Sequence, residues 1–174
     1  MKHAISPFTS KGRIALSLCA AVIVAGPAAS HDGTHHTVVP GDSVAWGAAP
    51  ASLPSGAKAA VLFGSPAKEG PFVLRLGLPA GFVVPPHRHS KDEFVTVLSG
   101  KVAFGTGETV DRTSVEPLPE GSFIHLPAGM PHYVVTFEDT VLQLNATGPF
   151  DVIYVDPESD PRTIPTTPPR GPIN

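Results

Sequence analysis

Two histidines and a glutamate lie close together in the middle of the chain, and all three side chains can bind metal ions. His87 and His89 are separated by one residue, and Glu93 follows after a short turn at Ser90–Asp92. Because alternate side chains of a strand point to the same face, we expect His87 and His89 to project together. Glu93 begins the next apolar run and can enter the same space from an adjacent strand. Imidazole and carboxylate groups bind Fe, Mn, Ni, Cu and Zn ions, so the pattern indicates a metal site.

A second segment supplies a further candidate ligand. Pro127 and Gly129 predict a tight turn that redirects the chain, and His132 then starts another apolar run. Three imidazoles and one carboxylate leave coordination positions open on a metal ion that binds more than four ligands. Open positions are typical of catalytic metal sites, whereas structural sites are closed.

The segment that must position these residues, 38–155, consists of short runs rich in Val, Phe, Leu and Thr that glycine and proline interrupt. It has no helical periodicity of useful length, and the regular interruptions predict an all-β sandwich or barrel. No internal repeat is visible, so we expect a single domain. The predicted strands are Ala59–Phe63, Phe72–Leu78, Phe94–Leu98, Lys101–Phe104, Ser122–Leu126, His132–Phe137, Val141–Leu144 and Phe150–Val155.

The composition excludes several classes of protein. With 174 residues, 41% of them hydrophobic and 16% charged, the chain can form one packed domain. The net charge of −3 comes without a basic stripe, which argues against binding to nucleic acid. Cys19 is the single cysteine, so no internal disulfide framework is possible.

The two ends of the sequence differ from its middle. Residues 1–30 have the features of a cleaved secretory signal. They begin with positive charge, continue with an uncharged apolar run over 14–25 and end with small residues at 28–30. We therefore expect a secreted or periplasmic protein with no membrane span after cleavage. The mature start, 31–37, contains His31, His35 and His36 and is expected to be flexible, with an adventitious metal as the alternative reading. The proline-rich residues 156–174 predict a tail that either lies over the barrel in extended form or stays mobile.

The spacing of the two histidine segments resembles the two signature motifs of the cupin superfamily. The matching positions are Gly81, His87, His89, Glu93 and Gly100 in the first motif and Gly121, Pro127, Gly129 and His132 in the second. The chain departs from the pattern at Thr136, where the family often has asparagine. The resemblance implies a double-stranded β-helix, or jelly-roll, barrel in which His87, His89, Glu93 and His132 hold one divalent transition metal. It also implies a homodimer.

Strand alternation predicts the surroundings of the metal. If Glu93 and His132 point inward, the residues two and four positions later on each strand do so as well. The predicted pocket is largely apolar and suits a small, partly apolar organic molecule. Its predicted lining is Phe82, Val95, Val97, Met130, Val134 and Thr136. Arg75 is expected on the outer face, opposite Phe72, Leu74 and Leu76, and His125 is expected to be structural.

Three functions agree with these residues. The first is a metal-dependent dioxygenase of the quercetinase-like cupin type, which the resemblance suggests, with Glu93 as a general base. The second is a non-catalytic secreted protein that binds a metal or a small ligand. The third is a metal-assisted isomerase or decarboxylase, which would need a cation near the metal for its anionic substrates. The metal could be Fe, Mn, Ni, Cu or Zn, since the ligand set accepts each of them.

Overall fold

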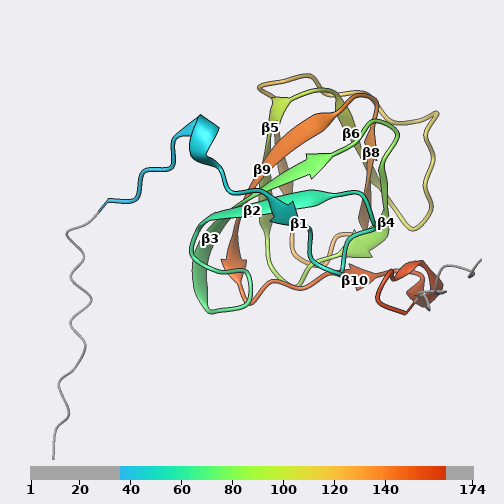
Figure 1. Cartoon of the computed structure of the whole chain (residues 1–174). Helices are drawn as coiled ribbons and strands as arrows, with labels where there is room; N and C mark the ends of the chain where they lie inside the picture. The colour runs from blue at the N-terminus through green and yellow to red at the C-terminus, as the bar shows by residue number, and fades with distance from the viewer. Residues whose placement is uncertain (1–35, 164–174) are drawn as a thin grey trace, which may run out of the picture. The chain divides into compact units, whose positions relative to one another are not determined.

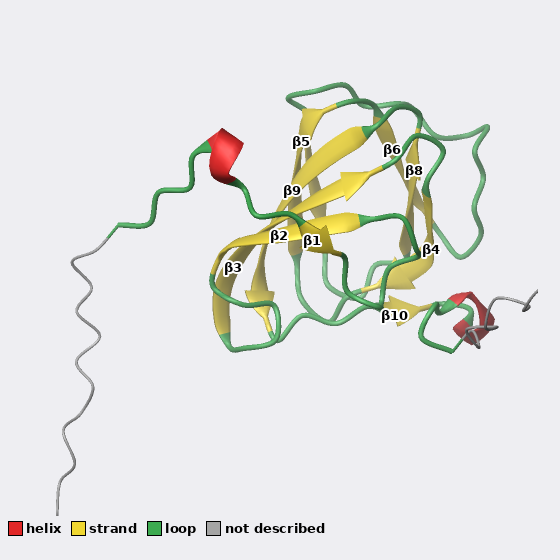
Figure 2. Ribbon diagram, in the orientation of Figure 1, coloured by secondary structure: helices red, strands yellow, loops and turns green. Residues whose placement is uncertain are grey.

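The secondary structure is almost entirely β in residues 36–163, which are the residues that the computed structural model describes (Figure 1). Apart from the strands, only two short 3₁₀ turns are present in this part of the chain, Gly41–Ser43 and Pro157–Ser159 (Figure 2). The strands are β1 (Gly47–Ala48), β2 (Lys58–Phe63), β3 (Gly70–Leu78), β4 (Val83–Arg88), β5 (Glu93–Ser99), β6 (Val102–Thr106), β7 (Phe123–Leu126), β8 (His132–Thr136), β9 (Thr140–Gly148) and β10 (Ile153–Tyr154).

The strands form two antiparallel sheets that enclose one core. One sheet has the order β1-β2-β3-β9-β5-β7, and the other has the order β10-β4-β8-β6. Strands far apart in sequence are therefore neighbours, with β3 beside β9 and β4 beside β8. This crossed arrangement is the jelly roll, so the predicted all-β, single-domain barrel is confirmed.

The alternation of β3 shows how the sequence fills the barrel. The strand pairs with β9 along its whole length, and Phe72, Leu74 and Leu76 point into the core at 1%, 8% and 7% exposure. Arg75 lies on the outer face, where its Nε donates a hydrogen bond of 3.2 Å to the Gln143 side chain. The predicted orientation of this strand is confirmed, and no arginine of β3 enters the barrel.

Each predicted strand overlaps an observed one, but the sequence did not predict β1 or β4. The omission of β4 has a physical reason, because Pro85 and Pro86 lie inside it and proline cannot donate to a sheet ladder. The structure accommodates them at an irregularity, where the pairing of β4 with β8 shifts register between Val84 and His87. A strand with two prolines therefore delivers the first metal-ligand candidate to the barrel interior.

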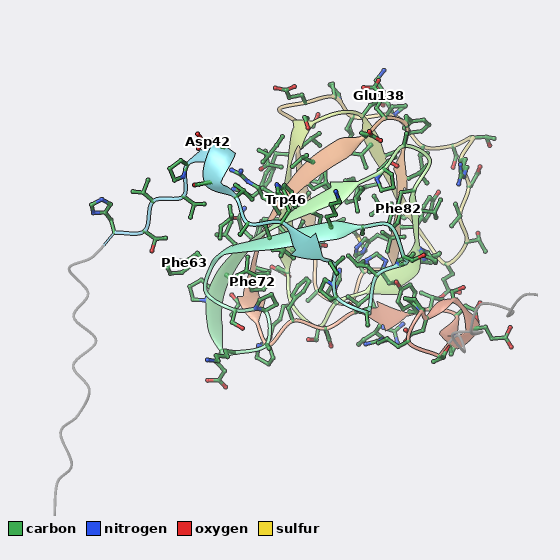
Figure 3. All side chains as sticks on the ribbon, viewed as in Figure 1. Asp42, Trp46, Phe63, Phe72, Phe82 and Glu138 are labelled. Atoms are coloured by element: carbon green, nitrogen blue, oxygen red, sulfur yellow. The ribbon has the colours of Figure 1, made fainter. Side chains whose placement is uncertain are left out.

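Aromatic side chains pack both in the core and on the outer face of the barrel. Phe82, labelled with Phe72 in Figure 3, is 8% exposed and packs in the same cluster of apolar residues. Trp46, also labelled there, precedes β1, and its ring lies against Gly77, where an added Cβ would meet it at 3.5 Å. Phe72 and Phe82 therefore belong to the core, whereas Trp46 packs on the outer face of β3.

The predictions for both ends of the chain lie largely outside the described residues. The signal over 1–30, most of the histidine-rich start and the tail from residue 164 onward stay predictions. Within 36–163, no helix is long enough and apolar enough to span a membrane.

Candidate metal centre

Three histidine rings meet inside the barrel. His87 lies on β4 and is paired with His132, the first residue of β8, and their ring centroids are 4.3 Å apart. His89 follows one residue after the end of β4, with its ring centroid 5.2 Å from that of His132. The three side chains are 4%, 5% and 1% exposed for His87, His89 and His132. Each offers a ring nitrogen, and these nitrogens lie within 4.8 Å of one another, which is close enough to share one ion.

Backbone carbonyls orient all three rings. In each histidine the Nδ1 atom lies at hydrogen-bonding distance from a carbonyl oxygen, so Nδ1 carries the proton and donates it. The Nε2 lone pair is then left free for a metal, which is the usual arrangement of metal-binding histidines. The acceptors are the carbonyls of Pro85 for His87 at 2.7 Å, Met130 for His132 at 3.0 Å and Asp151 for His89 at 2.5 Å.

Glu93, the first residue of β5, completes the group. Its Oε2 atom is 3.2 Å from Nε2 of His89 and 3.7 Å from Nε2 of His132, and the residue is 5% exposed. Both Nε2 atoms are fully buried and make no hydrogen bond. A buried polar atom without a partner costs about 1–3 kcal/mol. A metal ion would satisfy both nitrogens, so the donor set fits a divalent transition metal.

Two turns bring the ligands of the two motifs together. The Asp92 carboxylate, in the turn before Glu93, accepts the backbone N–H of Ala128 at 2.8 Å. In return the N–H of Gly129 donates to the carbonyl of His89 at 2.8 Å. Gly129 has a φ of +77°, a left-handed conformation that favours glycine. Gly129 of the second motif therefore helps to fix the backbone of His89, a candidate ligand in the first motif.

The electrostatics of the centre favour neutral ligand histidines at two of the three positions. Burial lowers the pKa of His87 to about 3, and the neighbouring His132 and His89 act in the same direction. Burial also lowers the pKa of His132. Burial acts to lower the pKa of His89, but the nearby Glu93 carboxylate and the contacts with Asp151 outweigh it, so this pKa is raised. Because ligand histidines must be neutral, protonation of His89 competes with metal binding.

A cavity of about 420 Å³ adjoins the four ligands, which form part of its wall. The remaining wall is mostly apolar, and its residues come from strands of both sheets and from the loops beside them. Among the described residues that line it, none is Lys or Arg, and Glu93 is the one acidic group. Representative apolar lining residues are Leu74, Leu76, Val95, Phe104, Val134 and Leu142.

The structure places the six residues of the predicted pocket in different environments. Val95 and Val134 line the cavity beside the ligands. The other four, Phe82, Val97, Met130 and Thr136, do not belong to its wall. The Thr136 hydroxyl is engaged elsewhere, because it accepts the N–H of Phe82 at 2.8 Å and donates to the Pro79 carbonyl at 2.6 Å. Strand alternation correctly predicted which side chains of β5 and β8 point inward. It could not predict how far along each strand the cavity extends.

His125 lies on the outer face of the barrel, away from the ligands. It is exposed, its ring stacks on Phe94 with centroids 4.9 Å apart, and its Nε2 is 3.5 Å from an Asp92 carboxylate oxygen. Its role is therefore structural, as expected.

Sequence reasoning missed the loop residues that line the cavity. Pro50, Ser52 and Leu53 come from the loop before β2, and Ser65 comes from the turn after it. Phe150, from the segment after β9, lines the cavity as well and stacks on His89. These residues belong to loops without periodicity, and no local pattern could assign them to a site that long-range pairing creates.

Comparisons with known proteins agree with the fold. The family model described as "Cupin domain" matches residues 74–153, a range that contains His87, His89, Glu93 and His132. No curated protein matches the chain in sequence.

Solved structures show the same fold at low sequence identity. The polyketide cyclase RemF from Streptomyces resistomycificus is 20% identical, with 73% of this chain and 90% of that chain covered and a TM-score of 0.60. The DMSP lyase DddQ from Ruegeria pomeroyi is 19% identical, with 67% of this chain and 64% of that chain covered and a TM-score of 0.53. KdgF from a Halomonas species is 17% identical, with 66% of this chain and 96% of that chain covered and a TM-score of 0.51. The family match over residues 74–153 and the jelly-roll topology together identify this part of the chain as a cupin domain.

Proposed function

We propose that the protein is a mononuclear metalloenzyme of the dioxygenase type that acts on a small, uncharged and largely apolar organic molecule. His87, His89, Glu93 and His132 would hold one divalent transition metal, with Fe, Mn, Ni, Cu and Zn as the candidates. When bound, such a metal supplies an electrophilic centre with open positions for substrate oxygen and dioxygen. The chain itself orients the substrate, excludes water and accepts a proton.

The observation that carries this proposal is the position of the ligands in the cavity wall. All four side chains line the 420 Å³ space, so a molecule within it lies directly against the metal position. The volume falls in the range of sites that bind small organic molecules, which is about 300–1,000 Å³. A purely structural metal site would be closed on all sides and would adjoin no such space.

The charge of the cavity favours a neutral substrate. Carboxylate and phosphate groups need a paired cation, and the described lining contains neither Lys nor Arg. Arg75, the cation that a decarboxylase or sugar isomerase could have used, is on the outer face with Gln143. The isomerase and decarboxylase alternative therefore lacks its expected anchor.

Glu93 is the group in the cavity wall that is suited to proton transfer. Its carboxylate lies against His89 and His132 and also faces the cavity. A hydroxylated substrate bound beside it could give its proton to an Oε atom. Glu93 would therefore act both as a ligand and as the general base.

Oxygen uptake by the metal-loaded protein tests the proposal. Samples loaded separately with Fe, Mn, Ni, Cu or Zn are mixed with flavonols, diketones and catechols, with a His132→Ala variant as control. We expect metal-dependent oxygen consumption that matches substrate loss and is absent in the control. Saturable binding without turnover would instead support a non-catalytic binding protein. Conversion under strict anaerobiosis would support the isomerase or decarboxylase alternative.

Export and dimerisation are further parts of this proposal. The sequence of residues 1–30 supports cleavage and delivery to the periplasm or the medium, and N-terminal sequencing of the mature protein would test it. The cupin resemblance supports a homodimer. Light scattering on the purified protein would distinguish the dimer from a monomer.

A further inference from the structure

The segment between β9 and β10 contacts one of the ligand histidines at several points. The Phe150 ring stacks on His89, with centroids 4.3 Å apart and an interplanar angle of 22°. The next residue, Asp151, accepts the His89 Nδ1–H at its backbone carbonyl. The Asp151 carboxylate accepts the backbone N–H of Ser90 at 2.8 Å. Two consecutive residues thus hold the face, the edge and the following peptide of one metal ligand.

His89 differs from the other two histidines in this respect. His87 and His132 donate their Nδ1 protons to carbonyls two residues earlier in their own segments. The carbonyl that orients His89 is 62 positions further along the chain, on Asp151. The direction of the His89 ring therefore depends on a separate piece of the fold, whereas the other two rings are oriented locally.

The segment that holds His89 is itself fixed. The N–H of Phe150 donates to the Pro66 carbonyl at 2.8 Å, and the ring meets Phe72 edge-on with centroids 5.4 Å apart. Gly148 packs so closely against the turn after β2 that a Cβ there would collide with the Lys68 carbonyl. A segment anchored in this way can impose an orientation on its neighbour.

We propose that Phe150 and Asp151 are positioning residues for His89 and thereby set the affinity and geometry of the metal centre. The proposal rests on the metal site of the proposed function. Its physical basis is that an imidazole free to rotate loses orientational entropy when it binds a metal, while a ring already held loses little. Loss of such supporting contacts typically lowers metal affinity by about 10- to 100-fold.

Matched substitutions separate positioning from packing. Asp151→Ala removes the acceptor for the Ser90 N–H, whereas Asp151→Asn keeps an oxygen at the same place. Phe150→Leu removes the stacked ring but keeps an apolar side chain, whereas Phe150→Tyr keeps the ring. Phe123→Ala is the control, since this phenylalanine is 64% exposed on β7 and does not line the cavity.

Cobalt(II) binding to the full-chain protein is the test, because its visible spectrum reports coordination geometry and chelator competition gives the dissociation constant. We expect Asp151→Ala and Phe150→Leu to bind Co(II) about tenfold or more weakly, with altered spectra. Asp151→Asn, Phe150→Tyr and the control should keep the affinity and spectrum of the unmodified protein. Far-UV circular dichroism of each metal-free variant establishes that it is folded.

The possible results distinguish this proposal from the function on which it rests. Unchanged affinity and spectra in folded Asp151→Ala and Phe150→Leu would overturn the positioning role and leave the metal site standing. The positioning role would also be overturned if Asp151→Asn weakened binding as much as Asp151→Ala, and Phe150→Tyr as much as Phe150→Leu. The oxygen retained in the first variant and the ring retained in the second would then not matter. If one removing variant does not fold, the pair at the other position decides the question. Failure of the unmodified protein to bind Co(II) would instead refute the metal site itself.

Discussion

Mild acid should destabilise the metal-free protein through His87. Burial lowers the pKa of this histidine in the folded state to about 3, from an ordinary value of 6.5. Below pH 6.5 the unfolded chain takes up a proton at this residue while the folded chain does not. Stability from His87 is therefore complete above pH 6.5 and is lost progressively as the pH falls from 6.5 toward 3.

The size of the effect follows from the two pKa values. Between pH 7 and pH 5 the unfolded state gains most of a proton that the folded state lacks, which lowers the free energy of unfolding by about 2 kcal/mol. The lowered pKa of His132 adds an effect of the same sign. The raised pKa of His89 acts oppositely, because it stabilises the folded state at low pH and loses this effect as the pH rises.

Urea unfolding at pH 7, 6 and 5 in the presence of a chelator measures this loss. A His87→Gln variant, whose side chain does not titrate, isolates the contribution of His87 from those of the other two histidines. We expect the unmodified protein to lose about 2 kcal/mol more than the variant between pH 7 and pH 5. The same pH dependence in both proteins would refute the reasoning, because it would mean that His87 is protonated as easily in the folded as in the unfolded chain.

Three further predictions concern the metal, the core and the cavity. A divalent metal at 100 times its dissociation constant should stabilise the fold by about 2.7 kcal/mol, seen as a rise in Tm that a chelator reverses. Gly105→Ala should lower the unfolding free energy by about 1–3 kcal/mol, because the new Cβ would collide with the Tyr133 ring, whereas Gly47→Ala, where the nearest atom is 4.0 Å away, should not. Val134→Phe should reduce binding of neutral aromatic molecules in equilibrium titrations without changing the metal content, since Val134 lines the cavity and is not a ligand. A loss of metal in that variant would contradict the separation of the two roles.

The grouping of the candidate metal ligands could be predicted from the sequence, because most of it follows from local features of the chain. His87 and His89 both point inward from a short segment, Glu93 starts a strand, and His132 follows a turn that Gly129 makes possible. The spacing of the two motifs identified these four residues without any knowledge of which strands pair. The pairing of β4 with β8 then brought His87 and His132 side by side.

The parts of the fold and the site that escaped prediction depend on long-range contacts. Pro85 and Pro86 concealed β4, whose irregular pairing with β8 exists only in the assembled sheet. Thr136 was expected in the pocket, but its hydroxyl is held by the backbone of a preceding segment. The contacts of Phe150 and Asp151 with His89 join segments about sixty residues apart. No periodic pattern in a single sequence reports such a contact.

The metal content of the purified protein tests the central claim most directly. The full chain is produced without an affinity tag, beside a His87→Ala/His132→Ala variant, and both are measured by elemental analysis before and after reconstitution. We predict about one equivalent of a divalent transition metal in the unmodified protein and its loss in the double variant. No metal in the reconstituted protein, or the same amount in both proteins, would contradict the account.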